Sequence, residues 1–191
     1  GGDSWLDMCA GPGGKAALLS SIARERGIRF TANEVSVPRA ELVKQVVQGD
    51  RVLVGDGREI GNQSEKFDAI LIDAPCTGLG ALRRRPEVRW RRTLQDLREL
   101  TQLQRELVES GINALAPGGV LGYATCSPHL AETSIQIADI KKRFPTMQQM
   151  EITPFLPDNL VDSERAGAMS LWTHKIGTDA MYLALFKKIA E

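Results

Sequence analysis

The sequence has few cysteines, no long apolar run and no excess of charge of either sign. Its three cysteines, Cys9, Cys76 and Cys126, are a poor basis for a disulfide framework, and no CxxC or Cys/His spacing predicts a zinc site. No run reaches the roughly 18 apolar residues that a membrane helix needs, so we expect no membrane span. These absences favour a cytoplasmic protein with reduced thiols, and neither a membrane nor a metal as its partner.

The charge is balanced overall but uneven along the chain. The 24 basic residues match the 24 acidic ones, so the net charge does not indicate a nucleic-acid partner. A composition of 42% hydrophobic and 25% charged residues excludes a disordered chain. Residues 83–92 (RRRPEVRWRR) contain six arginines. Such density is what a phosphate-binding patch needs, but a solvated basic loop explains the run equally well.

Short apolar runs alternate with longer amphipathic segments, which predicts a parallel, doubly wound α/β sheet with helices on both faces. Strands are expected at residues 4–8, 29–33, 52–54, 67–72, 120–124 and 181–187. Helices are expected at residues 15–26, 37–48, 93–115 and 132–144. Residues 154–179, rich in Pro, Gly, Asp and Ser, are expected to be irregular. The chain opens with Gly1 and Gly2, without Met, so we expect residues 1–191 to be one domain of a longer protein.

A glycine-rich loop is predicted between the first strand and the first helix. It follows Asp7 and Met8 and consists of Cys9, Ala10, Gly11, Pro12, Gly13, Gly14 and Lys15. Glycines permit a tight turn and let backbone N–H groups approach a ligand at a helix N-terminus. The loop alone fits a nucleoside site and an unrelated glycine turn equally well. It lacks the G-x-G-x-x-G pattern, which argues against an NAD-binding protein.

Acidic residues stand at the ends of the next two strands. Glu34 ends the second strand, about 20 residues after the loop, where an acidic side chain would accept ribose hydroxyl groups. Asp56 and Gly57 follow the third strand. A carboxylate there can accept a hydrogen bond from an adenine amino group, although a plain Asp-Gly turn is the simpler interpretation.

Two thiols stand at the ends of the fourth and fifth strands. Asp73 and Cys76 belong to the string DAPCTGLG after the fourth strand, and Cys126 belongs to TCSP after the fifth. Carboxyl ends of parallel strands share one edge of a sheet, so both thiols would face the same crevice. A structural cysteine is the alternative for each, because free cysteines are commonly buried. The pairing of two strand-end thiols favours a functional role.

Taken together, these strings resemble the Sun/Fmu-type family of ribosomal RNA cytosine-5 methyltransferases over essentially the whole chain. The matching strings are DMCAGPGGK, Glu34, GDGRE, DAPCTGLGALRRRPEVRWRR, LQRELVESGINALAPGGVLGYATCS and TDAMYLALF. The combination of DAPC with ATCS is highly specific. The resemblance implies one catalytic domain with the seven-stranded methyltransferase variant of the doubly wound sheet. It also implies S-adenosylmethionine as the cofactor and RNA, expected to be 16S ribosomal RNA, as the partner.

The resemblance assigns roles to the predicted site residues. The loop from Cys9 to Lys15 would wrap the methionine end of the cofactor, with Cys9 packing beside it. Glu34 would hold the ribose, and Asp56 with Gly57 the adenine. Asp73 and Lys15 would lie near both the cofactor and the target base.

The same resemblance places the nucleophile at Cys126 and the second cysteine at Cys76. C5 of cytosine is a poor nucleophile until a thiolate adds to C6, so the reaction needs an activated cysteine. Asp73 is the expected proton donor near N3 of the base. Cys76 is expected to assist the release of Cys126 after methyl transfer. The base must also be flipped into the pocket.

The basic run would then flank the pocket and meet the RNA backbone. The residues expected to contact RNA are Arg83, Arg84, Arg85, Arg89, Trp90 and Arg91. Trp90 could stack on a base or pack against protein, and His174 is expected to be an ordinary surface residue. The family has Asp-Gly-Phe-Phe where this chain has Asp179-Ala-Met-Tyr182, and members carry an upstream RNA-binding part that is not in this sequence.

Two other functions stay open at this point. One is a non-catalytic module that binds S-adenosylmethionine and RNA, which the presence of both thiols argues against. The other is a cytosine-5 methyltransferase with Cys76 as the nucleophile, as in DNA cytosine-5 enzymes. Mutating each thiol separately discriminates between the assignments.

Overall fold

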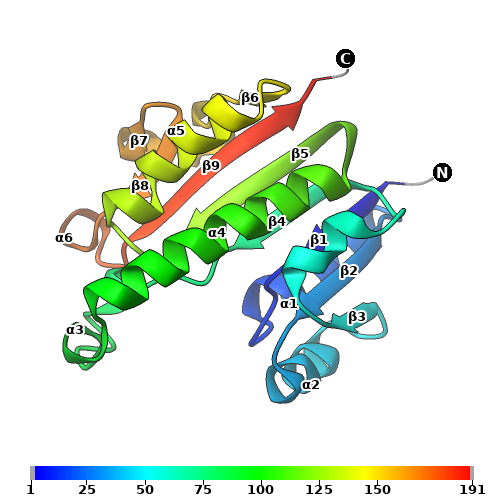
Figure 1. Cartoon of the computed structure of the whole chain (residues 1–191), viewed down its shortest axis with the longest axis horizontal. Coiled ribbons are helices and arrows are strands. Elements are labelled where there is room, and N and C mark those ends of the chain that lie inside the picture. The colour runs from blue at the N-terminus through cyan, green and yellow to red at the C-terminus, as the bar shows by residue number, and fades with distance from the viewer. Residues whose placement is uncertain (1–2, 190–191) are drawn as a thin grey trace.

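One mixed sheet of nine strands organises residues 3–189, the part of the chain that the computed structural model describes (Figure 1). The strands lie in the order β3-β2-β1-β4-β5-β9-β8-β7, and β6 also pairs with β9. Five of them are parallel: β1 (Ser4–Asp7), β2 (Arg29–Glu34), β3 (Arg51–Val54), β4 (Phe67–Asp73) and β5 (Leu115–Thr125). The doubly wound α/β prediction is confirmed. Residues 1–2 and 190–191 of the expected domain lie outside the described residues.

The sheet has more strands than the seven expected because residues after α5 add to its outer edge. β9 (Met181–Lys188) runs antiparallel to β5. The other three strands are β6 (Met147–Gln149), β7 (Glu164–Arg165) and β8 (Ala168–Leu171). β6 and β8 pair with opposite ends of β9, and β7 forms a hairpin with β8. The segment 154–179 is therefore only partly irregular: its short strands lack the apolar runs that sequence patterns detect.

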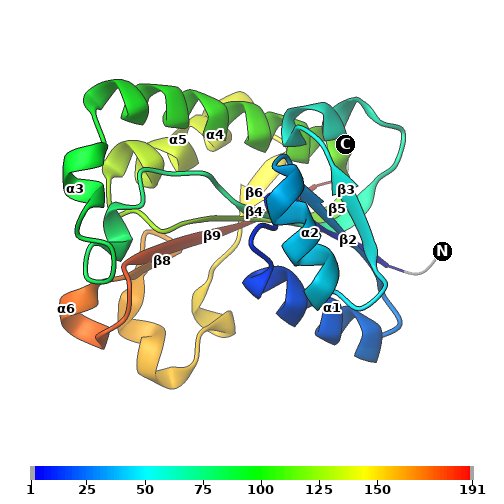
Figure 2. The ribbon, with the colours of Figure 1, turned by 90° about the horizontal axis from the view of Figure 1, so that it is seen from below.

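The main helices form two layers, one on each face of the sheet. α4 (Leu94–Ala114) and α5 (Ser134–Arg143) lie together on one side, and α1 (Gly14–Glu25) lies on the other (Figure 2). α2 (Val37–Val46) packs beside α1 and β3. These four helices fall where the periodicity predicted them.

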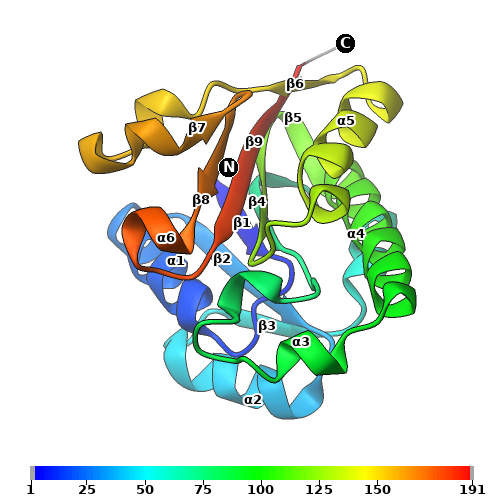
Figure 3. The same cartoon turned by 90° about the vertical axis from the view of Figure 1, so that its left-hand side faces the viewer.

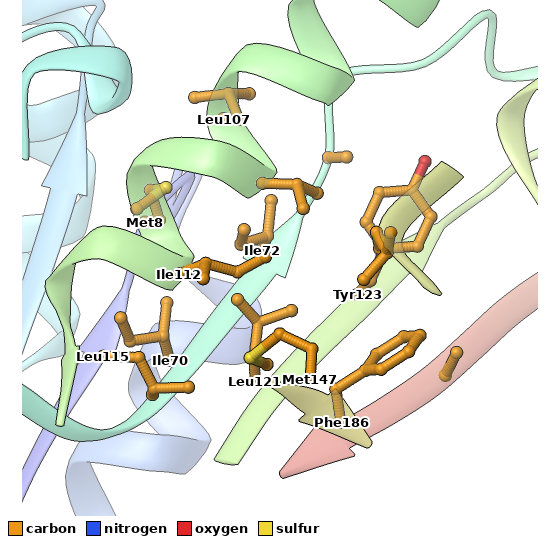
Figure 4. Packing of buried hydrophobic residues seen from close by; sticks show 14 of the residues in the cluster. Met8, Ile70, Ile72, Leu107, Ile112, Leu115, Leu121, Tyr123, Met147 and Phe186 are labelled. Carbon is orange, nitrogen blue, oxygen red and sulfur yellow. The ribbon is translucent and has the colours of Figure 1, made fainter. Parts of the chain in front are cut away.

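A separate apolar core fills each layer. Ala16, Ala23 and Val43 of α1 and α2 pack with Phe30 of β2. The larger core lies under α4 and α5, and residues such as Met8, Ile72 and Leu107 meet there (Figure 4). Complete burial of a side chain of this size stabilises the fold by roughly 1.5–3 kcal/mol. This larger core fixes β4 and β5, whose ends carry the two thiols of interest.

α4 begins at a capping box and ends directly at β5. Thr93 accepts a hydrogen bond from the N–H of Asp96, and the Asp96 carboxylate accepts one from the N–H of Thr93. The buried residues of α4 lie between Gln104 and Ala114, while Leu94 at its start is exposed. The first half of α4 therefore extends beyond the sheet (Figure 1). Its start is connected through α3 to the loop that follows β4.

Short helical segments surround the carboxyl ends of the parallel strands, onto which Figure 3 looks. They are η1 (Gly57–Asn62), η2 (Leu79–Ala81), α3 (Val88–Arg91), η3 (Leu130–Glu132) and α6 (Thr173–Ile176), whereas η4 (Thr153–Phe155) and η5 (Asp158–Ser163) connect β6 to β7. The chain winds outward from β1 through β2 to β3, then returns to β4 on the other side of β1. The switch point between β1 and β4 is where such sheets bind ligands. No helix of residues 3–189 has the length and hydropathy of a bilayer-spanning segment.

Candidate active site

A cavity of about 430 Å³ lies at the switch point, beyond the carboxyl ends of β1, β2 and β4. Its lining includes all three cysteines of the chain, Cys9, Cys76 and Cys126. It also includes the predicted site residues Gly11, Glu34, Asp56, Gly57 and Asp73. Strand ends that are far apart in sequence thus converge on one hollow, as the motif positions predicted.

Glu34 is anchored at the rim of this cavity by two backbone N–H groups. Its Oε2 accepts a hydrogen bond from the N–H of Gly11 at 2.9 Å, and its Oε1 accepts one from the N–H of Ser36 at 2.9 Å. A Cβ atom on residue 11 would lie 2.2 Å from Oε2, so only glycine leaves room for the carboxylate. The carboxylate oxygens retain lone pairs that can accept hydroxyl protons, which fits the expected ribose contact.

The remaining residues of the glycine loop form the turn between β1 and α1 and do not line the cavity. Ala10 is buried in the core between α1 and α2, and its N–H bonds to the carbonyl of Asn33. Gly13 is the N-cap of α1 and has a φ of 118°, which a residue with a side chain rarely adopts. Pro12 and Gly14 complete the turn but are not part of the cavity lining. The N-terminus of α1 therefore faces the loop, where it favours a negatively charged ligand group.

Asp56 occupies the expected position but its carboxylate already has a partner. Arg58 donates to it from its backbone N–H and from its guanidinium, at distances between 2.6 and 3.0 Å. These hydrogen bonds lower the pKa of Asp56. Arg58 also pairs with Glu106 of α4 at 2.9 Å. An adenine amino group would share the Asp56 carboxylate with Arg58.

Cys9 is half-buried and lines the cavity, and Asp7 is buried beneath it. Burial, reinforced by the charges of Asp7 and Glu34, raises the pKa of the Cys9 thiol, which suits a packing role. Asp7 is fully buried, and neither of its oxygens has a hydrogen-bond partner among the described residues. Burial and then the charge of Asp73 raise the pKa of Asp7 to about 7. Sequence reasoning gave Asp7 no role, although it opens the glycine-loop motif.

Lys15 forms an ion pair with Asp73; Asp73 lines the cavity, and Lys15 is not part of its lining. The Nζ atom of Lys15 donates to Oδ2 of Asp73 at 2.8 Å, and both side chains are partly exposed. Burial favours the neutral amine, but the hydrogen bond to Asp73 outweighs it and raises the pKa of Lys15. The two residues lie together, and the role of Asp73 as a proton donor stays a prediction.

Cys76 and Cys126 are brought into direct contact. Their Sγ atoms lie 3.3 Å apart. The hydrogen bond from Cys76, with a smaller contribution from Lys15, lowers the pKa of Cys126 to about 7, against burial and the charge of Asp73. That same hydrogen bond, followed by burial, raises the pKa of Cys76. The two thiols therefore have opposite pKa shifts, lowered at Cys126 and raised at Cys76.

The arginines of residues 83–92 divide into three groups. Arg84 binds the carboxylate of Asp179 through Nε at 2.9 and 3.0 Å, and Arg83 lies 3.8 Å from it. Arg85 lines the cavity together with Arg92, whose Nε donates to the carbonyl of Thr77 at 3.2 Å. These contacts hold the loop in place. Arg83 and Arg84, which were predicted to bind RNA, are therefore already paired with a protein carboxylate.

The third group lies on α3 and faces solvent. Trp90 is 75% exposed, and the guanidinium of Arg89 lies 6.0 Å from the centre of its ring. Arg91 is also exposed. Within residues 3–189 Trp90 is not packed into the core, and stacking on a base stays a prediction. His174 is exposed on α6, with its ring 6.1 Å from that of Trp172, as expected of a surface histidine.

Several polar residues of the site were not found by sequence reasoning. Arg39 bonds to the carbonyl of Gly11, and the amide of Asn33 joins the loops after β1 and β3. Glu132 is fully buried and binds the loop that holds Cys76. Their spacing follows no helical or strand period, so no pattern in the sequence marked them.

The molecule has another, larger cavity on the far side of Cys126. A second cavity, of about 810 Å³, lies between α5, β8 and the start of β9, and none of the predicted site residues lines it. Ser127 and Pro128, which follow Cys126, form part of its wall. Within residues 3–189, no cluster of three or more His, Cys, Asp or Glu side chains is arranged to hold a metal ion.

Known proteins resemble this chain in sequence and in structure. The family described as 16S rRNA methyltransferase RsmB/F matches residues 1–187. The protein MT1451 of Mycobacterium tuberculosis is 47% identical over 187 residues, which are 97% of this chain and 40% of that protein. Ribosomal RNA small subunit methyltransferase B of Enterobacter sp. is 42% identical over 146 residues, 74% of this chain and 34% of that protein. The chain thus spans 40% or less of these curated relatives.

A solved structure is similar over nearly the same span. The crystal structure of NSun6 from Pyrococcus horikoshii with SFG superposes with a TM-score of 0.84 at 26% sequence identity. The match covers 99% of this chain and 48% of that one. Similarity in sequence and in structure therefore extends over both strand ends that carry the thiols.

Proposed function

Because the chain belongs to the RsmB/F family of 16S rRNA methyltransferases, we propose that it methylates C5 of a cytosine in RNA through a covalent bond between Cys126 and C6 of the base. The observation that carries the proposal is the contact between the Sγ atoms of Cys76 and Cys126, 3.3 Å apart in one cavity. Two thiols with opposite pKa shifts are a feature that covalent catalysis needs and cofactor binding does not.

S-adenosylmethionine is the cofactor of the family, and when bound it supplies an electrophilic methyl group. The residues of this chain fit that molecule. Glycine at position 11 lets the Glu34 carboxylate lie against the loop, and that carboxylate has free lone pairs for the hydroxyl groups of a ribose. Asp56 and Gly57 would hold the adenine side, and the turn that leads from Gly11 into the N-terminus of α1 would hold the methionine carboxylate.

Cys126 begins the reaction as a thiolate. Its sulfur donates an electron pair to C6 of the cytosine, and the C5=C6 electrons move into the ring toward N3. The Lys15–Asp73 pair stands beside Cys126 and supplies the proton that N3 takes up. The adduct leaves C5 electron-rich enough to accept a methyl group.

Cys76 completes the reaction. Once Cys126 is bonded to carbon its negative charge is gone, and with it the hydrogen bond that most raises the pKa of Cys76. Cys76 then loses its proton to solvent. The overall reaction replaces a C–H bond by a C–CH₃ bond and releases one proton, and this is that proton. The Cys76 thiolate takes the proton from C5, the C5=C6 double bond forms again, and Cys126 leaves as a thiolate. N3 returns its proton to the Lys15–Asp73 pair as the ring becomes neutral. The resting thiol–thiolate pair is thereby restored.

The RNA partner is proposed to be 16S ribosomal RNA. Support comes from the family description and from the relative in Enterobacter sp. that is named for the small ribosomal subunit. Exposed Arg89, Trp90 and Arg91 on α3 flank the cavity mouth and would meet the phosphates and bases around the target. A cytoplasmic location follows from such a substrate.

Methyl transfer to unmodified 16S rRNA tests the proposal. After incubation with S-adenosylmethionine carrying a labelled methyl group, the RNA is digested and its nucleosides are separated by mass spectrometry. The proposal predicts label in 5-methylcytidine, and loss of that label in Cys126→Ala. Label in an N-methylated nucleoside would contradict the C5 assignment. Binding of both partners without any transfer would favour a non-catalytic module.

A further inference from the structure

A fully buried carboxylate, that of Glu132, lies directly behind the Cys76 loop. Glu132 ends η3, six residues after Cys126, and is 0% exposed. Its Oε1 accepts hydrogen bonds from the N–H of Thr77 at 2.8 Å and from Nε2 of Gln104 at 3.1 Å. Its Oε2 accepts a hydrogen bond from the hydroxyl group of Thr77. These donors are all uncharged, although a buried carboxylate is costly without a counter-charge.

The hydrogen bonds of Glu132 join the two loops that carry the thiols. Thr77 directly follows Cys76, and Ser127 directly follows Cys126. The hydroxyl oxygens of Thr77 and Ser127 lie 3.3 Å apart, so a chain of hydrogen bonds runs from Glu132 through Thr77 to Ser127. The positions of both sulfur atoms therefore depend on this one carboxylate.

A second set of contacts braces Glu132 from α4 and β5. The amide of Gln104 donates to the carbonyl of Pro75 at 2.8 Å as well as to Glu132. The hydroxyl group of Tyr123 donates to the backbone carbonyl of Glu132 at 2.8 Å. Gln104 and Tyr123 are both fully buried, so the network is rigid and shielded from water.

We propose that Glu132 is a positioning residue that holds Cys76 against Cys126 and so makes Cys126 the nucleophilic thiol of the pair. The inference rests on the proposed function for the roles of the two thiols. It assigns to Glu132 the choice between them, which the contact of the two sulfurs alone leaves undecided.

The charges around the pair act in the same direction. After the hydrogen bond to Cys126, burial and the charge of Cys126, the negative charge of Glu132 is a further cause that raises the pKa of Cys76. Cys126 instead faces Lys15, which favours its thiolate, and Asp73, which opposes it. Arg84 is near enough to interact with the Cys126 charge as well. Glu132 thus disfavours the wrong thiolate while its hydrogen bonds fix the donor for the right one.

The test is the partition of alkylation between the two thiols in the intact protein. Wild type, Glu132→Gln and Thr77→Val are treated briefly with iodoacetamide from pH 5.5 to 9.5, and peptides containing Cys76 and Cys126 are quantified by mass spectrometry. We expect wild type to be labelled first at Cys126. In both variants the ratio of Cys126 to Cys76 labelling should fall about tenfold, and the midpoint for Cys126 should rise by about one pH unit. Thr77→Ser, which keeps the hydroxyl group, should restore the wild-type ratio.

A control separates positioning from general loss of stability. Ser20→Ala removes buried hydrogen bonds to Val47 and Asp50 in the other layer and should leave the labelling ratio unchanged. A wild-type ratio in folded Glu132→Gln and Thr77→Val would overturn the inference. Should Glu132→Gln fail to fold, Thr77→Val decides alone. Methyl transfer by the same wild-type preparation is measured in parallel, so a shifted ratio without any transfer would contradict the proposed function and leave the positioning role standing.

Discussion

The sulfur atoms of Cys76 and Cys126 lie 3.3 Å apart although the two residues are separated by 50 positions in the chain. They meet because β4 and β5 are adjacent parallel strands, paired from Phe67 to Asp73, whose loops leave the same edge of the sheet. Cys76 is the more enclosed of the two, and Cys126 faces Lys15. This asymmetry gives the two thiols different chemistry.

Removing Cys76 should make Cys126 less reactive at neutral pH. The hydrogen bond from Cys76 lowers the pKa of Cys126 to about 7, so the wild-type thiolate forms as the pH rises through 7. In Cys76→Ala the midpoint for alkylation of Cys126 should move up to about 8.5, the value of an unperturbed thiol. Rates of iodoacetamide labelling against pH measure the shift. An unchanged midpoint would mean that Cys76 is not the hydrogen-bond donor.

Asp7→Asn should change how stability depends on pH. Burial and the charge of Asp73 raise the pKa of Asp7 to about 7, so the folded state binds this proton more tightly than the unfolded chain. The stability that this proton contributes is complete below about pH 4 and is lost as the pH rises through 7. Relative to wild type, the variant should therefore gain about 4 kcal/mol in free energy of unfolding between pH 4 and pH 8. Urea unfolding at both pH values measures it, and a difference that does not vary with pH would contradict the raised pKa.

Gly11→Ala should weaken cofactor binding without unfolding the sheet. Its Cβ would lie 2.2 Å from Oε2 of Glu34 and 2.8 Å from Nε of Arg39, so the carboxylate must leave its place. We expect the Kd for S-adenosylmethionine to rise by about tenfold or more, equivalent to about 1.4 kcal/mol, by isothermal titration calorimetry. Gly122→Ala is the control, because its Cβ would make only ordinary contacts at 3.5 Å inside β5. Equal affinity of the Gly11 variant and wild type would remove Glu34 from the proposed ribose site.

The exposed arginines of α3 should contribute to RNA affinity through charge. Replacing Arg89 and Arg91 by alanine removes two cations that face solvent beside the cavity. Each lost phosphate contact should reduce the slope of log K against log salt concentration by about 0.7–0.9. Filter binding at several salt concentrations measures the slope, with Arg26→Ala at the far end of α1 as the control. If both variants gave the wild-type slope, the basic run would be a solvated loop.

Sequence patterns predicted the central elements of the fold because those elements are periodic. The apolar spacing along α4 and the continuous apolar run of β4 each follow from burial, and both occur where expected. Strands β6, β7 and β8 are two to four residues long and pair along one edge, so no pattern distinguished them from loops. Their position depends on β9, which becomes a partner only in the folded sheet.

The candidate site divides in the same way. Cys76 and Cys126 were predictable because each follows a recognisable strand within a distinctive string. The buried polar residues Asp7, Gln104 and Glu132 were not, because each acts through groups far away in sequence. Glu132 meets Thr77 from a distance of 55 residues, and only tertiary packing brings the two together. The bond between Arg84 and Asp179, 95 residues apart, was hidden for the same reason.

The most direct test of the mechanism is to trap the protein–RNA adduct. Wild type, Cys76→Ala, Cys126→Ala and the double variant are incubated with 16S rRNA and S-adenosylmethionine and run on a denaturing gel. If Cys126 attacks C6 and Cys76 releases it, only Cys76→Ala accumulates a slow-migrating covalent complex. An adduct that persists in Cys126→Ala and is absent from Cys76→Ala would reverse the roles of the two thiols and contradict the mechanism.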